Sequence, residues 1–204
     1  MKDKIPKHIA IIPDGNRRWS VEKGMLKTAG HVIAGAYENL YPLFREARDL
    51  GVRYVSLWGF STENWKREEK EVNEILNVIS KGLDRLEKEF EKENLCVKHI
   101  GRKDRLPKKL IEKLEKIEEA SKDCDGLTVL FCIDYGGRDE IIRSVNKIVK
   151  KGKAIGEKEF SDSLDTKGIP DVELIIRTGG EKRLSGFMPF QSDYAEIYFL
   201  DKHF

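Results

Sequence analysis

The sequence has few cysteines, no long apolar run and almost no net charge. Its three cysteines, Cys96, Cys124 and Cys132, lack the spacing of a metal site, and their odd number indicates reduced thiols rather than a disulfide framework. No apolar run approaches the roughly 20 residues of a membrane span, and the N-terminus lacks the apolar core of a signal peptide. The formal net charge is +2 although 36% of the residues are charged, which gives no general attraction to nucleic acid. We therefore expect a soluble cytoplasmic protein that does not bind nucleic acid.

Several common catalytic motifs are also absent. The sequence has no G-x-x-x-x-G-K-[ST] phosphate loop, no G-x-G-x-x-G after its first strand and no nucleophile elbow. These absences weaken the cases for nucleotide hydrolysis, for dinucleotide redox chemistry and for acyl transfer.

The apolar pattern predicts one α/β domain over residues 1–204. A chain of 204 residues can bury a single large core. Alternating and continuous apolar runs predict strands, and apolar residues at helical spacing predict helices. We expect strands at 9–12, 52–58, 95–100, 127–133, 172–176 and 196–199, and helices at 32–50, 68–93, 107–120, 140–151 and 157–164. This alternation is typical of a mostly parallel six-stranded central sheet flanked by helices on both faces.

The most informative stretch is residues 8–19, where an apolar run stops at a carboxylate, a glycine, an amide and two guanidiniums. Asp14 and Asn16 are good N-caps for a following helix. The start of a helix offers free N–H groups to an anion, and Arg17 and Arg18 add donors suited to a phosphate or diphosphate. Asp14 could hold Mg²⁺ against that ligand. A capped helix start with solvated arginines explains the same residues, so both interpretations stay open on spacing alone.

The other predicted strands also end in polar loops. In an open parallel sheet these loops meet beyond the carboxyl ends of the strands, where ligands bind. The loops carry Ser61, Asn64 and Arg67, then Asp134 and Arg138, and finally Arg177, Arg183 and Ser185. Such a cationic rim suits two phosphorylated ligands and a divalent cation better than a neutral substrate.

Four segments together resemble one family, the cis-prenyltransferases of the undecaprenyl diphosphate synthase type. They are residues 8–19, the pair Gly30-His31, residues 60–67 with Glu71-Val72 beyond, and residues 171–199 with R-T-G-G-E-K-R-L-S and Y-A-E-I-Y-F. The resemblance implies Mg²⁺-dependent condensation of isopentenyl diphosphate onto an allylic diphosphate, with a new cis double bond and release of diphosphate. It also implies a homodimer and a hydrophobic tunnel between long helices.

The resemblance further implies roles for individual residues. The allylic diphosphate would bind at Gly15, Asn16, Arg17 and Arg18 with His31 nearby, and isopentenyl diphosphate at Arg177, Arg183 and Ser185. Asp14 would hold Mg²⁺ and assist departure of diphosphate, with Glu196 joining the metal site, either from the same chain or from a partner subunit. Asn64 matches a position that helps to remove a proton from isopentenyl diphosphate, with Ser61 and Arg67 as supports. Because an amide is a poor base, we expect Asn64 to orient rather than accept the proton.

Simpler interpretations remain beside these roles. His31 could be an ordinary surface or core histidine, and Asp134 and Arg138 could pin a turn to the start of a helix. Trp19 and Trp65 are interpreted as packing residues, although they could also wall a prenyl channel and so contact the substrate.

The product and the chain end are less clearly indicated. Gly59 leaves room where a bulky residue would shorten the product in the family, so we expect a medium-chain polyprenyl diphosphate, a lipid-carrier precursor. Peripheral membrane contact through that lipid product is left open. Family members commonly continue past Y-A-E-I-Y-F to a terminal R-x-G, so we expect a shortened C-terminal end. A non-catalytic prenyltransferase-like subunit of a hetero-oligomer and a phosphohydrolase are the alternatives, and the polar residues favour the transferase over both.

Overall fold

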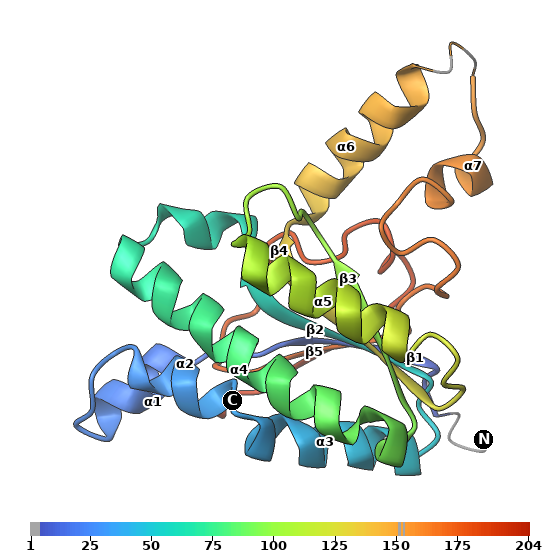
Figure 1. Cartoon of the computed structure of the whole chain (residues 1–204). Coiled ribbons are helices and arrows are strands. Elements are labelled where there is room, and N and C mark those ends of the chain that lie inside the picture. The colour runs from blue at the N-terminus through green and yellow to red at the C-terminus, as the bar shows by residue number, and fades with distance from the viewer. Residues whose placement is uncertain (1–4, 151, 153) are drawn as a thin grey trace.

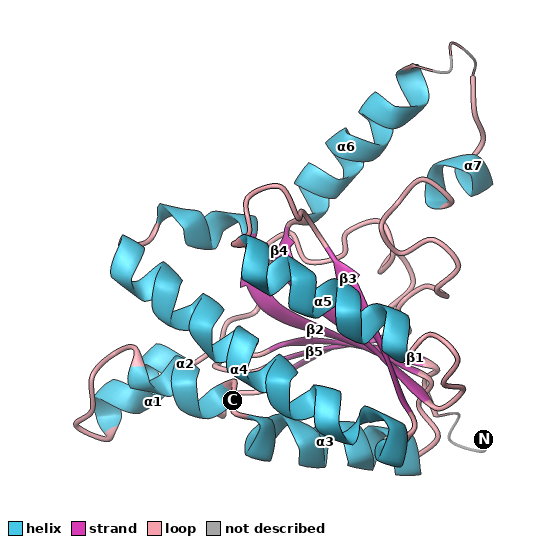
Figure 2. Ribbon diagram, viewed as in Figure 1, coloured by secondary structure: helices cyan, strands magenta, loops and turns pink. Residues whose placement is uncertain are grey.

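Six parallel strands form one sheet in the computed structural model of the protein, which describes residues 5–150, 152 and 154–204. The order across the sheet is β3-β4-β2-β1-β5-β6, so β1 pairs with β2 on one side and with β5 on the other (Figures 1 and 2). The strands are β1 (His8–Ile12), β2 (Tyr54–Ser61), β3 (Leu95–Ile100), β4 (Leu127–Tyr135), β5 (Leu174–Arg177) and β6 (Glu196–Phe199). The predicted fold class is confirmed, and the sheet is wholly parallel rather than mostly parallel.

The helices follow the strands in the expected alternation. They are α1 (Asn16–Glu22), α2 (Ala29–Ala34), α3 (Tyr37–Asp49), α4 (Glu69–Glu93), α5 (Lys108–Ala120), α6 (Gly137–Val149) and α7 (Glu157–Ser161), with a short 3₁₀ helix, η1 (Thr62–Lys66). The long amphipathic helix predicted over 68–93 is confirmed as α4. Lys151, the last residue of the helix predicted over 140–151, lies outside the described residues.

The helix predicted over 32–50 is wrong as a single element, because the chain breaks it into α2 and α3. Ala36 is extended, with φ −66° and ψ 141°. The preceding residue, Gly35, lies so close to α4 that a Cβ there would be 2.6 Å from Cγ1 of Val78. Apolar spacing continues through the break, which is why periodicity alone joined the two helices.

Two strands extend further than predicted, and both extensions lead to the polar loops. β2 continues through Ser61, with its pairing to β4 shifting between Trp58 and Phe60 and again before Ser61. β4 continues to Tyr135. An irregular register of this kind is common beside functional sites, where it changes the direction of a strand end.

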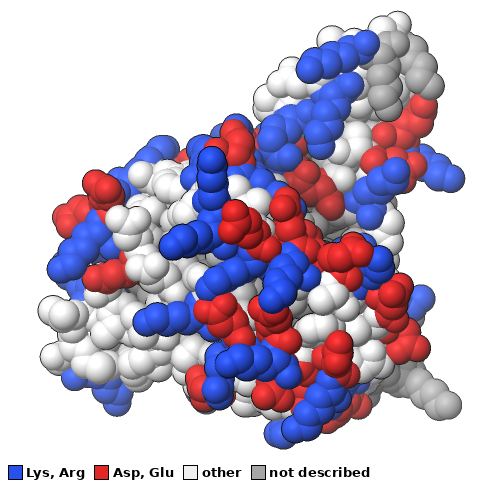
Figure 3. Space-filling model, viewed as in Figure 1, with Lys and Arg blue, Asp and Glu red and all other residues white. Residues whose placement is uncertain are grey.

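The sheet is covered on both faces except at its edge strand β6, where Glu196, Ile197 and Tyr198 are exposed. Helices α3, α4 and α5 cover one face, as Figure 1 shows, with Phe44, Leu86 and Leu114 among the buried side chains. The other face packs mainly on the segment between α7 and β6, including Phe187 and Met188. On the outer side of α4 and α5, positive and negative side chains alternate (Figure 3). Among the described helices, none combines the length and the apolar character needed to cross a bilayer.

Candidate active site

A polar pocket lies beyond the carboxyl ends of β1, β2 and β5. It brings together twelve of the residues that the sequence singled out: Asp14, Gly15, Asn16, Arg17, Arg18, His31, Ser61, Asn64, Arg67, Arg177, Arg183 and Ser185. These residues come from the β1–α1 junction, from His31 in α2, from the end of β2 with η1 and Arg67, and from the end of β5 with its following loop. The parallel sheet places them at one edge, as its topology predicts.

The first loop connects β1 to α1 through a left-handed glycine. Gly15 has φ 102° and is the N-cap residue of α1, without a side-chain capping bond. The expectation that Asp14 or Asn16 caps this helix is therefore wrong. The carboxylate of Asp14 instead accepts the Gly15 N–H at 2.7 Å, and Asn16 is the first helical residue. Asp14 thus points toward the pocket rather than along the helix axis.

Three hydrogen bonds join the first loop and α1 to the loop after β5. The backbone N–H of Asp14 donates to Oγ1 of Thr178 at 2.9 Å, and that hydroxyl donates to the Asp14 carbonyl at 2.7 Å. The Arg18 guanidinium donates to the Gly179 carbonyl. Gly179 has φ 84°, and a Cβ there would lie 2.8 Å from the Asp14 carbonyl carbon. Only glycine permits this approach.

Arg177 is the buried centre of the pocket. Its guanidinium donates to Oδ2 of Asp14 at 2.8 Å, to Oγ of Ser185 at 2.8 Å and to the Arg183 carbonyl. Burial by itself would raise the pKa of Asp14. The hydrogen bond from Arg177, the Gly15 N–H and the charges of Arg177 and Arg18 outweigh burial and hold that pKa below its ordinary value. Asp14 is therefore ionised at neutral pH.

The remaining arginines are more exposed than Arg177. The side chains of Arg17, Arg18 and Arg183 are 45%, 48% and 61% exposed. They line the pocket with their charges accessible to a ligand. Exposed guanidiniums can exchange water for phosphate oxygens at little cost, and their planar fork suits bidentate binding.

Glu71 contacts three basic side chains on the side of the pocket formed by α2 and α4. Its Oε1 accepts from Arg67 at 2.5 Å and lies 3.6 Å from Nε2 of His31 and 3.8 Å from Arg17. Burial and the positive charge of Arg67 lower the pKa of His31 more than Glu71 raises it. His31 is therefore a neutral hydrogen-bonding group at neutral pH.

His31 reaches the pocket because α2 crosses α1 very closely. A Cβ at Gly30 would lie 1.9 Å from the Asn16 carbonyl oxygen. The glycine of the Gly30-His31 pair is therefore required by packing, and it brings the next residue to the pocket.

Asn64 lies in η1 with its acceptor already occupied. The Ser61 N–H donates to Oδ1 of Asn64 at 2.8 Å. This contact fixes the orientation of the side chain, and an amide is in any case a poor base.

Three predicted site residues do not line the polar pocket. Trp65 packs edge-on against Phe60, at 5.1 Å between ring centroids, and Trp19 lies in α1. Glu196 begins β6, where it pairs with Leu174, whereas Arg177 pairs with Phe199 at the other end of the strands. Within one chain, Glu196 is therefore not brought to Asp14.

An apolar pocket adjoins the polar one between the sheet and helices α2, α3 and α4. The two pockets share Pro13, Asn16, His31, Gly59 and Ile75. The apolar pocket continues past side chains that include Tyr37, Leu40, Phe44, Leu83, Leu86 and Phe131. The combination fits an amphiphilic ligand with an anionic head and a hydrocarbon tail.

The pocket offers few protein ligands to a metal ion. Within residues 5–150, 152 and 154–204, no group of three or more His, Cys, Asp or Glu side chains is arranged to hold one. Among the described residues that line the pocket, the carboxylates are Asp14, which pairs with Arg177, and Glu181, which pairs with Arg18 and Arg183. Mg²⁺ commonly binds through one or two carboxylates, with water and substrate phosphates as further ligands. The donor set fits Mg²⁺ that arrives with a diphosphate.

Comparison with known proteins places this site in a family. Residues 12–204 match the family model of undecaprenyl diphosphate synthase. An isoprenyl transferase of Aquifex pyrophilus is 42% identical over 200 residues, covering 98% of this chain and 86% of the relative. An isoprenyl transferase of Thermotoga maritima is 40% identical over 204 residues, covering 98% of this chain and 87% of the relative.

Two solved structures are also similar to this chain over nearly its whole length. Lavandulyl diphosphate synthase from Lavandula x intermedia, in complex with dimethylallyl diphosphate, superposes with a TM-score of 0.90 at 31% identity, covering 97% of this chain and 88% of that one. A probable undecaprenyl diphosphate synthase from Campylobacter jejuni superposes with a TM-score of 0.81 at 36% identity, covering 97% of this chain and 86% of that one. The protein is a prenyltransferase. The chain belongs to the undecaprenyl diphosphate synthase family.

Sequence reasoning missed two residues that shape the site. Glu71 was noted within a matching segment but received no role; it lies in the first turn of α4 and pairs with Arg67, which precedes that helix in extended conformation. Thr178 received no role, because a threonine after a strand gives no signal of a contact with a loop 164 residues away.

Proposed function

We propose that this prenyltransferase condenses isopentenyl diphosphate onto an allylic diphosphate in a Mg²⁺-dependent reaction, forming a cis double bond and releasing diphosphate. The observation that carries the proposal is the junction of the two pockets. A pocket lined by several arginines and by the carboxylates of Asp14 and Glu181 opens directly into an apolar one. This arrangement suits a substrate whose head is a diphosphate and whose tail is a growing hydrocarbon.

The two halves of the cationic pocket suit two diphosphates. Gly15, Asn16, Arg17 and Arg18 lie at the start of α1, next to His31 and next to the mouth of the apolar pocket. We assign the allylic diphosphate to this half. The similar lavandulyl diphosphate synthase was solved with dimethylallyl diphosphate, which is an allylic diphosphate. Arg177, Arg183 and Ser185 form the other half, to which we assign isopentenyl diphosphate.

Charge development on the leaving group explains why the donors are fixed before reaction. Breaking the allylic C–O bond leaves negative charge on diphosphate, and preorganised guanidiniums and N–H groups stabilise that charge most in the transition state. Asp14 would hold Mg²⁺, which when bound supplies further neutralisation of the departing diphosphate. Asn64, with Ser61 and Arg67, would orient isopentenyl diphosphate while its proton leaves.

The apolar pocket is the proposed start of a tunnel for the product. Gly59 lies at the boundary of the two pockets, with Cδ1 of Ile79 at 3.8 Å from the position of a Cβ. The space at this boundary suits a chain longer than one or two isoprene units, so we propose a medium-chain polyprenyl diphosphate that serves as a lipid-carrier precursor.

We also propose a homodimer. Helix α6 projects from the body (Figure 1) and exposes Ile142, Val145 and Val149, while β6 exposes Ile197 and Tyr198. Apolar side chains in this number are typical of surfaces that another chain covers. In such a dimer, Glu196 would serve the partner's metal site. We place the enzyme in the cytoplasm, with peripheral membrane contact through its lipid product.

One assay tests the proposal. The protein is incubated with labelled isopentenyl diphosphate, Mg²⁺ and, in separate reactions, dimethylallyl, geranyl, farnesyl or geranylgeranyl diphosphate, and the apolar products are sized. We expect label in an apolar product with at least one starter and none after chelation of Mg²⁺. Failure to incorporate label with every starter would overturn the proposal. Light scattering of the eluted protein tests the dimer.

A further inference from the structure

The segment Asp134–Gly137, which joins the end of β4 to the start of α6, contacts both polar loops although it does not line the polar pocket. On one side, Nε1 of Trp65 donates to Oδ1 of Asp134 at 2.8 Å. On the other, the Gly137 N–H donates to the Gly186 carbonyl at 2.9 Å. Gly186 directly follows Ser185 at the pocket. The segment therefore joins the loop that carries Asn64 to the loop that carries Ser185.

The packing of this segment leaves no room for movement. A Cβ at Gly136 would lie 2.4 Å from Oγ1 of Thr62, and a Cβ at Gly137 would lie 2.0 Å from Cδ of Pro189. The two adjacent glycines allow the backbone to lie directly against both loops.

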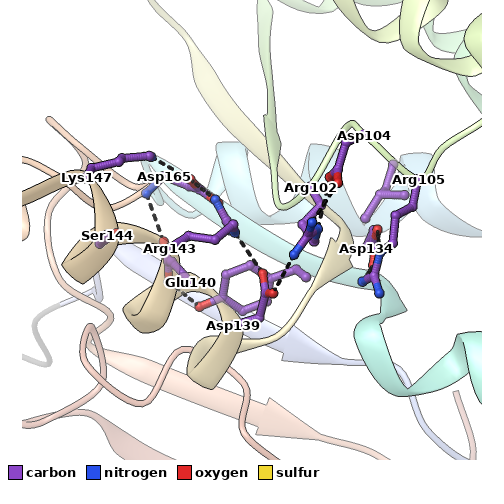
Figure 4. Close-up of polar contacts among 12 residues, drawn as sticks. Arg102, Asp104, Arg105, Asp134, Asp139, Glu140, Arg143, Ser144, Lys147 and Asp165 are labelled. Carbon is purple, nitrogen blue, oxygen red and sulfur yellow. Dashed lines mark hydrogen bonds and ion pairs between the residues drawn. The ribbon is translucent and has the colours of Figure 1, made fainter. Parts of the chain in front are cut away.

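Asp134 is the most constrained residue of the segment. Its side chain is fully buried, and its backbone is left-handed with φ 53°, a conformation that asparagine and aspartate tolerate better than most residues. Besides Trp65, the carboxylate accepts from Nε of Arg105 at 2.9 Å and from a second Arg105 nitrogen. Figure 4 draws this pair beside the separate network of Arg102, Asp139 and Arg143.

Arg105 and Asp134 together hold the indole of Trp65. The Arg105 guanidinium lies 5.7 Å from the centroid of the Trp65 ring, while the carboxylate fixes the position of the indole nitrogen. The other edge of the ring packs on Phe60. These three contacts, with Arg105, Asp134 and Phe60, hold the side chain in one orientation.

A capping box between Ser61 and Asn64 holds η1 locally, and Trp65 adds the contacts that hold it against β4. A 3₁₀ helix of five residues has poor hydrogen-bond geometry, so these tertiary contacts add to its stability. Asn64 directly precedes Trp65 and Arg67 follows it by two residues, and both line the polar pocket while Trp65 does not. The inward-facing side chain of Trp65 therefore sets the positions of Asn64 and Arg67, which face the pocket.

We propose that Asp134 is a positioning residue for the condensation: through Trp65 it holds η1 so that Asn64 and Arg67 face the bound isopentenyl diphosphate. This inference rests on the proposed function for its kinetic consequence. It replaces the earlier interpretation of Asp134 as a group that pins a turn to a helix start, because α6 is preceded by Gly136 without a side-chain capping bond.

Three variants separate the contacts of Asp134. Trp65→Phe keeps an aromatic ring and the Asp134–Arg105 pair but removes the indole donor. Asp134→Ala removes the acceptor, and Asp134→Asn keeps an acceptor oxygen while removing the charge. We expect Trp65→Phe and Asp134→Ala each to lower kcat about tenfold, since one buried hydrogen bond to a charged group supports a change of this size. Asp134→Asn should recover most of the lost kcat.

The pattern of kinetic constants distinguishes positioning from general destabilisation. The allylic half of the pocket is built by a different loop, so KM for the allylic diphosphate should stay within about twofold of wild type while kcat falls. The double variant Asp134→Ala, Trp65→Phe should be no slower than either single variant, because both remove the same contact. Full additivity of the two effects in kcat would overturn the proposal.

Asp139→Asn is the matched control. Asp139 also pairs with two arginines, Arg102 and Arg143. In the part of the chain that the structure describes, it makes no direct contact with η1, and its partner Arg102 meets Asp134 only through a backbone hydrogen bond that Asp139→Asn leaves in place. We expect wild-type kcat from this variant. If it lowers kcat as much as Asp134→Ala does, loss of any ion pair in this region explains the result and the proposal is wrong.

Amide hydrogen exchange tests the same inference without substrate. In the free protein, Asp134→Ala and Trp65→Phe should speed exchange over residues 61–67 and leave α4 unchanged, whereas Asp139→Asn should not change residues 61–67. Unchanged exchange over 61–67 in both variants would overturn the proposal. If wild-type protein makes no product while exchange behaves as expected, the proposed function fails and the structural role of Asp134 stands. If Asp134→Ala does not fold, Trp65→Phe carries both measurements.

Discussion

The carboxylate of Asp14 and the guanidinium of Arg177 lie 2.8 Å apart, although 163 residues separate them in the chain. Asp14 follows β1 and Arg177 ends β5, two neighbouring strands of the parallel sheet. The contact joins the two halves of the polar pocket and keeps Asp14 ionised before any ligand binds. It also means that a cation bound at Asp14 must share this carboxylate with Arg177.

Replacement of Asp14 should lower catalytic activity far more than it lowers folding stability. We expect Asp14→Ala to lower product formation about 10²-fold or more, because the residue that would hold the cation at the departing diphosphate is lost. Folding should survive, with a loss of about 1–2 kcal/mol in the free energy of unfolding from the unpaired Arg177. Label incorporation and urea unfolding measure the two effects. Asp49→Asn, which breaks the surface pair with Arg48, is the control. Near-normal turnover by Asp14→Ala would contradict the assigned role.

Comparing Gly179→Ala with Gly168→Ala separates the cost of the close approach between the two loops from the cost of backbone strain. Gly168 has a similar positive φ, 78° against 84°, but a Cβ at Gly168 meets nothing within 4 Å. We expect Gly168→Ala to cost about 1 kcal/mol through strain. Gly179→Ala should cost a further ~1–3 kcal/mol, because its methyl group pushes against the Asp14 carbonyl.

The same pair of variants should differ in ligand binding. Calorimetry with inorganic diphosphate should show weaker binding by Gly179→Ala and unchanged binding by Gly168→Ala. Equal stability and equal binding of the two variants would show that the loop contact has no energetic importance.

Gly59 should set the length of the product. A Cβ at this position would meet Ile79, Cys132 and Ile133 only at ordinary contact distances, 3.8–3.9 Å, so Gly59→Leu should fold and extend its side chain into the boundary of the pockets. We expect shorter products, seen by mass spectrometry of the extracted lipids. Gly156→Leu, at a site where a Cβ meets nothing within 4 Å, should leave the product distribution unchanged. Identical products from Gly59→Leu and wild type would place the growing chain elsewhere.

Stability should fall as the pH drops below about 6.5, the ordinary pKa of histidine. Burial lowers the pKa of His8, His31 and His99, so in the range between the lowered values and 6.5 the unfolded chain binds more protons than the folded one. Each such histidine contributes a slope of at most about 1.4 kcal/mol per pH unit. His31→Gln should therefore reduce the slope of unfolding free energy against pH from 7 to 5. The same slope in His31→Gln and wild type would show that His31 does not contribute.

The sequence allowed the sheet, the long helix α4 and the grouping of the polar loops to be predicted, because each follows from local pattern and from the geometry of parallel strands. The N-cap at Gly15 was not predicted, since Asp14 makes its hydrogen bond to a neighbouring N–H in a loop whose shape depends on β5. The break between α2 and α3 was not predicted either, because it depends on contact with α4. The contact of Asp134 with Trp65 was also not predicted, because the two residues lie 69 positions apart in the sequence. Contacts between distant segments decide these details, and no local pattern records them.

The place of β1 in the sheet has a consequence for how the protein is made. β1 leaves the ribosome before its partner β2, from which α1, α2 and α3 separate it, and long before its other partner β5, in which Leu174 pairs with Ile9. Until residues 174–177 have been synthesised, one edge of this apolar strand has no partner in the final fold. Pairing of such distant segments is slow to form and leaves an open strand edge in the meantime. The nascent chain should therefore depend on protection from aggregation until β5 emerges.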